Sequence, residues 1–267
     1  MSDYQSSNIL GHRGELALHH WPQPQPRFLA LLVHGYGEHL GRYHHVAARL
    51  ATIGGYVAGP DHAGHGLSQG ERVRIDDFEA VVDDLHLTVQ ALRAQLPALP
   101  LIVIGHSMGG MIATRYVQLH GGVSGLVLSG PLLGEHTQIT ALCDLPEIPD
   151  APLDITTLSR DPAVGARYQA DPLVWHGPFK RPTLLAMRRM LSAIHHGPGF
   201  GALPVLWLHG VEDKLVLMAQ SRQTLEVLRG ADFDSESYPG AQHEIFNEIN
   251  QDAVLDRVCG FIQRLLG

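Results

Sequence analysis

The segment 105–109, Gly-His-Ser-Met-Gly, constrains the fold more than any other part of this sequence because of what stands on either side of it. Residues 101–104 form a short, branched apolar run typical of a buried central strand, and residues 111–120 carry apolar side chains at helical spacing. Small residues on both sides of Ser107 allow a tight strand-to-helix turn that lifts the serine hydroxyl clear of the sheet. A G-x-S-x-G sequence in this context is typical of a nucleophile elbow, so Ser107 is the candidate nucleophile.

Length and composition indicate one large globular α/β domain. The chain has 267 residues, of which 45% are hydrophobic, enough for a sizeable core. No apolar run approaches the ~20 residues that span a bilayer, and the first twenty residues lack the pattern of a secretory signal, so we expect a cytoplasmic protein. In that compartment Cys143 and Cys259 are expected to be free thiols. The net charge of -8 argues against nucleic-acid binding and against electrostatic docking on anionic lipid.

Histidines are frequent, with 18 in the chain, but most need no catalytic function. His34, His39 and His44 lie close in sequence without a carboxylate or cysteine framework, so we expect neither a metal nor another cofactor. Three adjacent pairs are expected on the solvated surface: His19-His20, His44-His45 and His195-His196.

A glycine-punctuated loop follows one of the first predicted strands. Strands are expected over 15–21 and 28–34, joined by a proline-rich turn, and the second ends in the loop 34–39, His-Gly-Tyr-Gly-Glu-His. Such a loop can point a backbone N–H into the space in front of the nucleophile. We therefore predict an oxyanion hole built from the backbone amides of Tyr36 and Met108, the latter directly after the serine.

The rest of the chain, apart from one region, alternates between strand and helix patterns, which predicts a mostly parallel sheet flanked by helices. The glycine- and histidine-rich loop 60–72 lacks the Lys-Ser/Thr of a phosphate-binding loop, so His62 and His65 are interpreted as structural. Further strands are expected over 55–59, 125–129, 204–210 and 232–238, and helices over 43–53, 76–96, 217–229 and 252–266.

Residues 131–203 break this alternation. The region has clustered prolines and one clear helix pattern, over 182–195. Because some 70 structureless residues are unusual inside a compact domain, we interpret it as an inserted module that separates a first core segment, 1–130, from a second, 204–267. Apolar residues of this helix are expected to pack on the catalytic domain and to line an apolar pocket above it, among them Leu184, Met187 and Leu191.

An acid and a base follow Ser107 in the order that this arrangement requires. Asp213 lies in the loop after the strand 204–210, and His243 lies in a glycine-started loop after the last strand. Ser107 would attack an acyl carbonyl, His243 would accept its proton and pass it to the leaving alcohol, and Asp213 would orient the imidazole. Glu212 is the rival acid next to Asp213.

Several motifs together carry a family resemblance: HGYGEH with GRY at 34–43, DHAGHG at 61–66, GHSMGG at 105–110, HGVED at 209–213 and YPGAQHEIFNE at 238–248. On these the chain resembles the bacterial monoacylglycerol lipases of the serine α/β-hydrolase superfamily over nearly its whole length. The resemblance implies the α/β-hydrolase fold, the triad Ser107, Asp213 and His243, a cap over an acyl channel, and Glu38 and Arg42 near the glycerol head group. The mammalian enzymes carry a histidine three residues after the catalytic one, where this chain has Phe246.

We therefore expect a metal-free serine esterase that cleaves monoacylglycerol into fatty acid and glycerol through an acyl-enzyme. A lysophospholipase or a general carboxylesterase could use the same triad. A ligand receptor that kept the fold without turnover is disfavoured by the intact triad and oxyanion loop. A proline-releasing aminopeptidase would need carboxylates in the cap to hold a free amine, and the candidates are Asp144, Glu147, Asp150 and Asp154.

Contact with a membrane, if it occurs, must use apolar cap surface because the net charge of -8 gives no attraction to anionic lipid. Attachment is expected to be weak, reversible and insensitive to salt. The sequence leaves the oligomeric state open. The candidate contact residues are Ile139, Leu142, Leu145 and Ile148.

Overall fold

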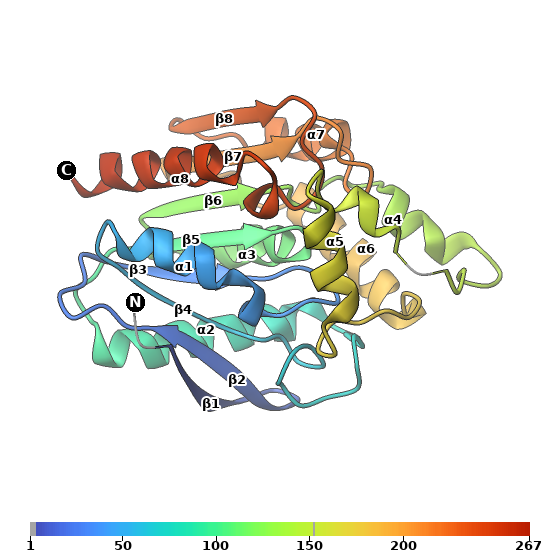
Figure 1. Cartoon of the computed structure of the whole chain (residues 1–267), viewed down its shortest axis with the longest axis horizontal. Coiled ribbons are helices and arrows are strands. Elements are labelled where there is room, and N and C mark those ends of the chain that lie inside the picture. Colours follow the sequence, from blue (N-terminus) through green and yellow to red (C-terminus); the bar gives the residue numbers. More distant parts are fainter. Residues whose placement is uncertain (1–3, 152) are drawn as a thin grey trace.

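The computed structural model describes residues 4–151 and 153–267, and its centre is an eight-stranded sheet in the order β1-β2-β4-β3-β5-β6-β7-β8 (Figure 1). Strands β3 to β8 pair in parallel, as the alternating pattern predicts, whereas β2 pairs antiparallel with both β1 and β4. The strands are β1 (Gln5–Gly11), β2 (Gly14–Trp21), β3 (Phe28–Val33), β4 (Gly55–Pro60), β5 (Leu101–His106), β6 (Gly125–Ser129), β7 (Val205–Gly210) and β8 (Phe233–Tyr238).

Helices cover both faces of the sheet. Helices α1 and α8 pack together on one face, and α2 and α3 pack together on the other, where α6 joins them. No helix within the described part of the chain is long and apolar enough to cross a membrane. The core helices are α1 (His44–Ala51), α2 (Phe78–Gln95), α3 (Met108–Leu119), α7 (Met218–Leu228) and α8 (Gln251–Leu266), and those of the insert are α4 (Gln138–Ala141), α5 (Pro162–Ala170) and α6 (Arg181–His195). Short 3-10 turns are η1 (Leu40–Tyr43), η2 (Leu142–Asp144), η3 (Ile155–Thr157) and η4 (Ile245–Asn247).

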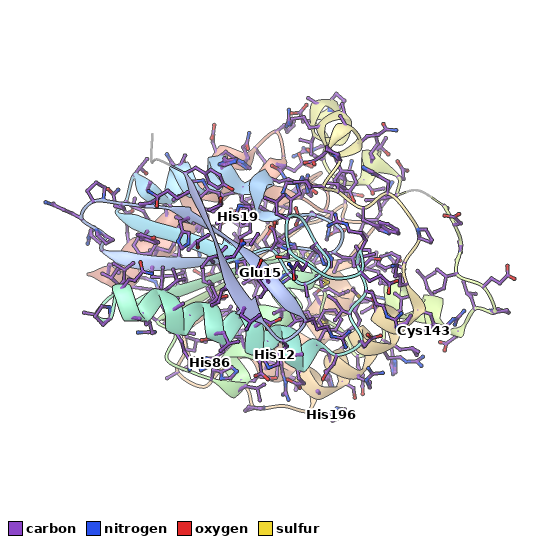
Figure 2. All side chains as sticks on the ribbon, turned by 90° about the horizontal axis from the view of Figure 1, so that it is seen from below. His12, Glu15, His19, His86, Cys143 and His196 are labelled. Carbon is purple, nitrogen blue, oxygen red and sulfur yellow. The ribbon has the colours of Figure 1, made fainter. Side chains whose placement is uncertain are left out.

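Strand β1 was not predicted, and it changes the environment of two histidines. Its residues are mostly exposed and polar, so no periodicity marks it, and its conformation depends on pairing with β2. Tyr4 and β1 cover His19 and His20, which are 1% and 8% exposed, so the prediction of a solvated pair is wrong here (Figure 2). The ring nitrogens find partners: His19 Nδ1 lies 2.8 Å from the Tyr4 hydroxyl and His20 Nε2 lies 2.9 Å from Ser7 Oγ.

Both cysteines are free thiols, as predicted. Cys143, labelled in Figure 2, lies in turn η2 of the cap, and Cys259 lies on α8 in the core. Each side chain is buried. Burial raises the pKa of both thiols, which keeps them protonated and unreactive at neutral pH.

The loop after β4 is braced by histidines, which confirms the structural interpretation of His62 and His65. The backbone N–H of His62 donates to His34 Nε2 at 3.0 Å, and His65 Nδ1 lies 3.1 Å from the carbonyl oxygen of Ala63. Burial lowers the pKa of His62 to about 4 and that of His65 to about 3. Both rings are therefore neutral at physiological pH and act as polar packing.

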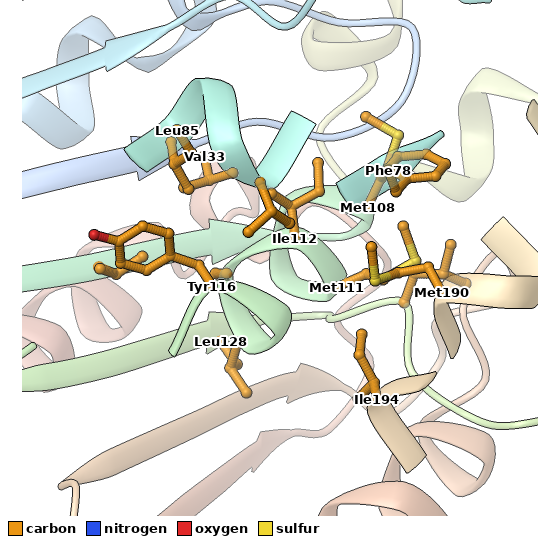
Figure 3. Close-up of a cluster of buried hydrophobic side chains, with 14 of the residues drawn as sticks. Val33, Phe78, Leu85, Met108, Met111, Ile112, Tyr116, Leu128, Met190 and Ile194 are labelled. Atoms are coloured by element: carbon orange, nitrogen blue, oxygen red, sulfur yellow. The ribbon is translucent and has the colours of Figure 1, made fainter. Parts of the chain in front are cut away.

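Helix α6 joins the cap to the core. Its apolar stripe packs against α3 and α2, and Met190 and Ile194 belong to the same buried cluster as Met111 and Phe78 (Figure 3). A second tie is Thr183, whose hydroxyl donates to the carbonyl of Val73 at 2.8 Å. Burial of such a stripe contributes roughly 25 cal/mol per Å² of apolar surface. The buried residues of α6 belong to the same apolar cluster as residues of the sheet, so α6 is held by the core of the protein.

The elbow has the strained geometry that its sequence predicts. Ser107 has φ 53° and ψ −120°, a conformation that is costly for a residue with a side chain. Helix α3 begins at Met108, three residues earlier than the apolar pattern indicated, because glycines carry no periodic signal. A Cβ on Gly109 would lie 2.0 Å from the carbonyl oxygen of Val33, so the approach of α3 to β3 requires glycine.

Gly109→Ala should therefore lower the free energy of unfolding by about 3 kcal/mol or more, because the clash is with backbone that cannot rotate away. Gly260→Ala is the matched control: it lies in α8, an added Cβ meets nothing within 4 Å, and it should stabilise by about 0.5–1 kcal/mol. Urea unfolding midpoints measure both changes. Equal midpoints for the two variants would contradict the close-approach argument.

Candidate active site

The predicted triad is assembled. Ser107 stands between β5 and α3, Asp213 follows β7, and His243 follows β8, so all three lie beyond the carboxyl ends of parallel strands. His243 Nε2 is 2.9 Å from Ser107 Oγ, and His243 Nδ1 is 2.7 Å from Asp213 Oδ2. The geometry fits the tautomer in which Nδ1–H donates to the carboxylate and Nε2 accepts from the serine hydroxyl.

Asp213 is built to remain ionised. Its Oδ1 accepts the backbone N–H groups of Leu215 and Val216, each at 2.9 Å. Burial opposes ionisation, but the facing charge of His243 and hydrogen bonds from His209 and His243 hold the pKa of Asp213 below its ordinary value. The rival Glu212 is exposed to solvent. These contacts favour Asp213 as the orienting acid.

His209 is a supporting residue that the sequence analysis missed. Its Nε2 lies 2.9 Å from the carbonyl oxygen of Val216 and 3.3 Å from Asp213 Oδ2, and its Nδ1 accepts from Trp207 Nε1 at 3.2 Å. The ring therefore holds the loop that carries the acid. Its sequence signal was its place in the HGVED motif at the end of β7.

The surroundings of His243 favour its protonated form. Burial acts against the charge, but the negative charge of Asp213, its hydrogen bond, and the nearby Glu244 and Glu38 together raise the pKa of His243. A general base with a raised pKa is a stronger proton acceptor, and its imidazolium is stabilised when the serine proton moves.

The predicted oxyanion residues lie at the nucleophile. Tyr36 and Met108 both line the cavity that contains Ser107. Met108 is the first residue of α3, where N–H groups have no acceptor within the helix. The loop of Tyr36 is close, since a Cβ on Gly35 would lie 3.2 Å from the Cβ of Ser107. The role of the two amides stays a prediction, and this placement supports it.

A cavity of about 400 Å³ opens over the triad, covered by the insert. Of the three predicted pocket residues on α6, Met187 lines it. Leu184 and Leu191 do not line it, and both belong to the buried core cluster. Apolar side chains dominate the lining: Leu132, Ile139, Leu142, Ile148, Leu153, Ile155, Leu158, Trp175, Phe179, Met187 and Leu215.

Glu38 and Arg42 form the predicted charge pair, but a third residue changes its meaning. Arg42 Nη1 donates to Glu38 Oε2 at 2.6 Å and to Glu244 Oε1 at 2.8 Å, and Nη2 donates to Glu244 Oε2 at 2.7 Å. Glu38 and Glu244 line the cavity, whereas Arg42 does not. The predicted contact of Arg42 with glycerol is therefore unsupported by the geometry, because Arg42 is outside the cavity lining and both of its terminal nitrogens bind carboxylates. Glu244 was missed, although it directly follows the catalytic histidine.

Three further predictions can be compared with the structure. Phe246 is buried in the core and is not in the wall of the main cavity.

Among the membrane candidates, Ile139, Leu142 and Ile148 line the cavity, and Leu145 alone of the four is exposed, at 40%. The four cap carboxylates predicted for an amine-binding site are not gathered: Asp144, Glu147 and Asp150 are exposed outside the cavity lining, and Asp154 alone of the four reaches it.

Comparisons with known proteins agree with this geometry. A family model described as serine aminopeptidase, S33 matches residues 24–250. Monoacylglycerol lipase of Mycolicibacterium smegmatis is 38% identical over 251 residues, which cover 90% of each protein. The chain belongs to the monoacylglycerol lipase family.

Two further relatives extend the comparison within this family. Human monoglyceride lipase is 30% identical over 239 residues, covering 85% of this chain and 79% of that protein. The crystal structure of the monoacylglycerol lipase of Paleococcus ferrophilus superposes with a TM-score of 0.78 at 27% identity, covering 92% and 99% of the two chains. These relationships show that the chain has the α/β-hydrolase fold and is a carboxylic ester hydrolase. The match to the serine aminopeptidase, S33 model describes the wider family to which the lipases belong.

The assignment of the acid can be tested with a matched pair of variants. Asp213→Asn should lower kcat about 10³- to 10⁴-fold, because the imidazole loses its orienting charge. Glu212→Gln removes the same charge one residue away, on an exposed side chain, and should be nearly silent. Steady-state hydrolysis of a nitrophenyl ester measures both. The reverse ranking would refute Asp213.

The raised pKa of His243 also fixes the direction of the pH dependence. The base acts only when neutral, so kcat/KM is full above its pKa and is lost as the pH falls through it. The acid limb should therefore lie above the ordinary value of 6.5. Glu244→Gln should move the limb to lower pH because it removes a negative neighbour, while Glu212→Gln should leave it in place. A limb below 6.5 in the wild type would contradict this electrostatic picture.

Proposed function

We propose that this protein hydrolyses monoacylglycerol to a fatty acid and glycerol through an acyl-enzyme on Ser107. The observation that carries the proposal is an assembled triad at the wall of one capped, largely apolar cavity of about 400 Å³. A cavity of this size suits a single acyl chain. The names of the Mycolicibacterium and human relatives, monoacylglycerol lipase and monoglyceride lipase, point to the same substrate class.

The catalytic cycle follows from the contacts. Ser107 Oγ attacks the ester carbonyl while His243 Nε2 accepts its proton, and the backbone amides of Tyr36 and Met108 stabilise the developing oxyanion. His243 then donates the proton to the glycerol oxygen, which leaves. Water enters, His243 takes one of its protons, and the resulting attack releases the fatty acid and restores the serine.

Substrate size and the nucleophile can be tested together. With acyl chains of matched length, monoacylglycerol should be hydrolysed at least about tenfold faster than triacylglycerol, because one cavity leaves two further chains without space. Ser107→Ala should lose about 10⁴-fold or more in kcat and should no longer react with a fluorophosphonate probe. Fatty-acid release and probe labelling measure the outcomes. Brisk triacylglycerol hydrolysis, or labelling that survives in Ser107→Ala, would refute the proposal.

We further propose that any membrane contact is weak and apolar and involves Leu145, the exposed member of the four cap candidates. Leu145→Asp should reduce the fraction of protein that sediments with phosphatidylcholine vesicles, and Leu10→Asp, an equally apolar exposed site on β1, should not. Binding should not fall as salt rises. Vesicle binding that is strong at low salt and lost at high salt would contradict this mechanism.

A further inference from the structure

Two buried carboxylates face the cavity beside the catalytic histidine, and a single guanidinium serves both. Glu38 and Glu244 are each 4% exposed and both belong to the cavity wall. Arg42 bridges them with contacts of 2.6 to 2.8 Å and also stacks on Tyr168, with its guanidinium carbon 5.0 Å from the ring centroid. One positive charge against two negative charges leaves the cluster with a net charge of −1.

The neighbours of this cluster do not restore neutrality: His243, which can carry a positive charge, is paired with the Asp213 carboxylate at 2.7 Å. Every remaining contact donates to a carboxylate: the N–H of Gly35 and the hydroxyl of Tyr43 donate to Glu38 Oε1 at 2.7 Å, and Asn247 Nδ2 donates to Glu244 Oε2 at 2.9 Å. His106, which lines the same wall, is neutral near pH 7 because burial and the charge of His243 lower its pKa to about 4. Burial lowers the pKa of His45, which lies behind the cluster, so that ring is neutral as well.

The cluster lies on the side where the alcohol leaves. The departing oxygen must come within hydrogen-bond distance of His243 Nε2, since that nitrogen returns the proton to it. Glu244 is the next residue along the chain, and Glu38 lies in the loop that carries Tyr36. The apolar cap residues provide the surface on which the acyl chain would pack. The head group is therefore the part of the substrate that meets the two carboxylates.

Resting on the function proposed above, we propose that Glu244 is a specificity-determining residue that excludes substrates with an anionic head group. No lysine or arginine lines the described part of the cavity, so a phosphate entering it would meet uncompensated negative charge. Arg42, the natural phosphate ligand nearby, is held by carboxylates on both of its terminal nitrogens. A neutral glycerol meets acceptors instead, and a cationic head group meets an attractive wall.

The experiment compares three octanoyl esters in the wild type: 1-octanoylglycerol, its 3-phosphate and octanoylcholine. Octanoylglycerol should exceed the phosphate ester about 100-fold or more in kcat/KM, and octanoylcholine should also far exceed it. A buried charge is little screened, so raising salt from about 0.05 to 0.5 M should change the ratio less than about threefold. Repulsion by the overall charge of -8 would instead fade with salt.

Glu244→Gln should lower the preference for the neutral over the phosphate ester at least about tenfold. Glu212→Gln, which makes the same change in net charge at an exposed site outside the cavity, should keep the wild-type ratio. Thermal unfolding reports whether each variant is folded, and the wild-type salt series tests the proposal without any substitution.

The outcomes distinguish failure of this inference from failure of the proposed function. Equal turnover of neutral and phosphate esters in the wild type, a ratio that collapses in high salt, or an unchanged ratio in folded Glu244→Gln would each overturn the inference and leave the proposed function standing. Failure to hydrolyse octanoylglycerol while nitrophenyl octanoate is cleaved would overturn the proposed function and this inference with it.

Discussion

The structure depends on one close approach, that of helix α3 to strands β3 and β5 at the elbow. Gly105 and Gly109 are pressed against backbone on both sides, with space for hydrogen atoms only. This contact bends the chain so sharply that Ser107 takes a left-handed φ of 53°. It also places the start of α3, with its free N–H groups and partial positive charge, under the nucleophile. The reactive hydroxyl, half of the predicted oxyanion hole and the floor of the cavity thus result from one packing constraint.

The second organising feature is the buried ion cluster around Arg42, which ties three separate segments to each other. It connects the loop after β3, through Glu38, to the loop after β8, through Glu244, and it stacks on Tyr168 of cap helix α5. Removing charges from water is costly, and such clusters persist only when every group has partners. Here the carboxylates accept from Arg42, Tyr43, Asn247 and a backbone N–H. The loop of His243 and the loop of Tyr36 are consequently held in one geometry.

Sequence reasoning succeeded where the signal is local. The elbow is a contiguous motif, and the buried parallel strands are apolar runs, so the sheet and the positions of Ser107, Asp213 and His243 could be read directly. Strand β1 could not, because its polar residues are ordered by pairing with β2 and not by their own pattern. The role of Glu244 was hidden for a similar reason: its partner Arg42 is about 200 residues away in the chain. Likewise Leu184, Met187 and Leu191 share one helical stripe, and periodicity alone cannot say which of them reaches a cavity.

The second part of the cap is attached to the loops that carry Tyr36 and His243. Residues 158–183 meet the core at several polar joints: Arg160 pairs with the fully buried Glu248, Asp171 with His39, and the N–H of Trp175 donates to Gly37 O. Two of these joints fall in the loop of Tyr36 and one falls in the loop of His243, so this part of the cap braces the catalytic loops directly. The segment 138–156 contributes mainly apolar side chains to the cavity. Residues of 158–183 line the cavity as well, and Trp175 and Leu158 do both: they line it and hold the loops of Tyr36 and His243 through the bonds Trp175 N–H to Gly37 O and Glu244 N–H to Leu158 O. The shape of the cavity is therefore coupled to the position of these two loops, because the same residues define both.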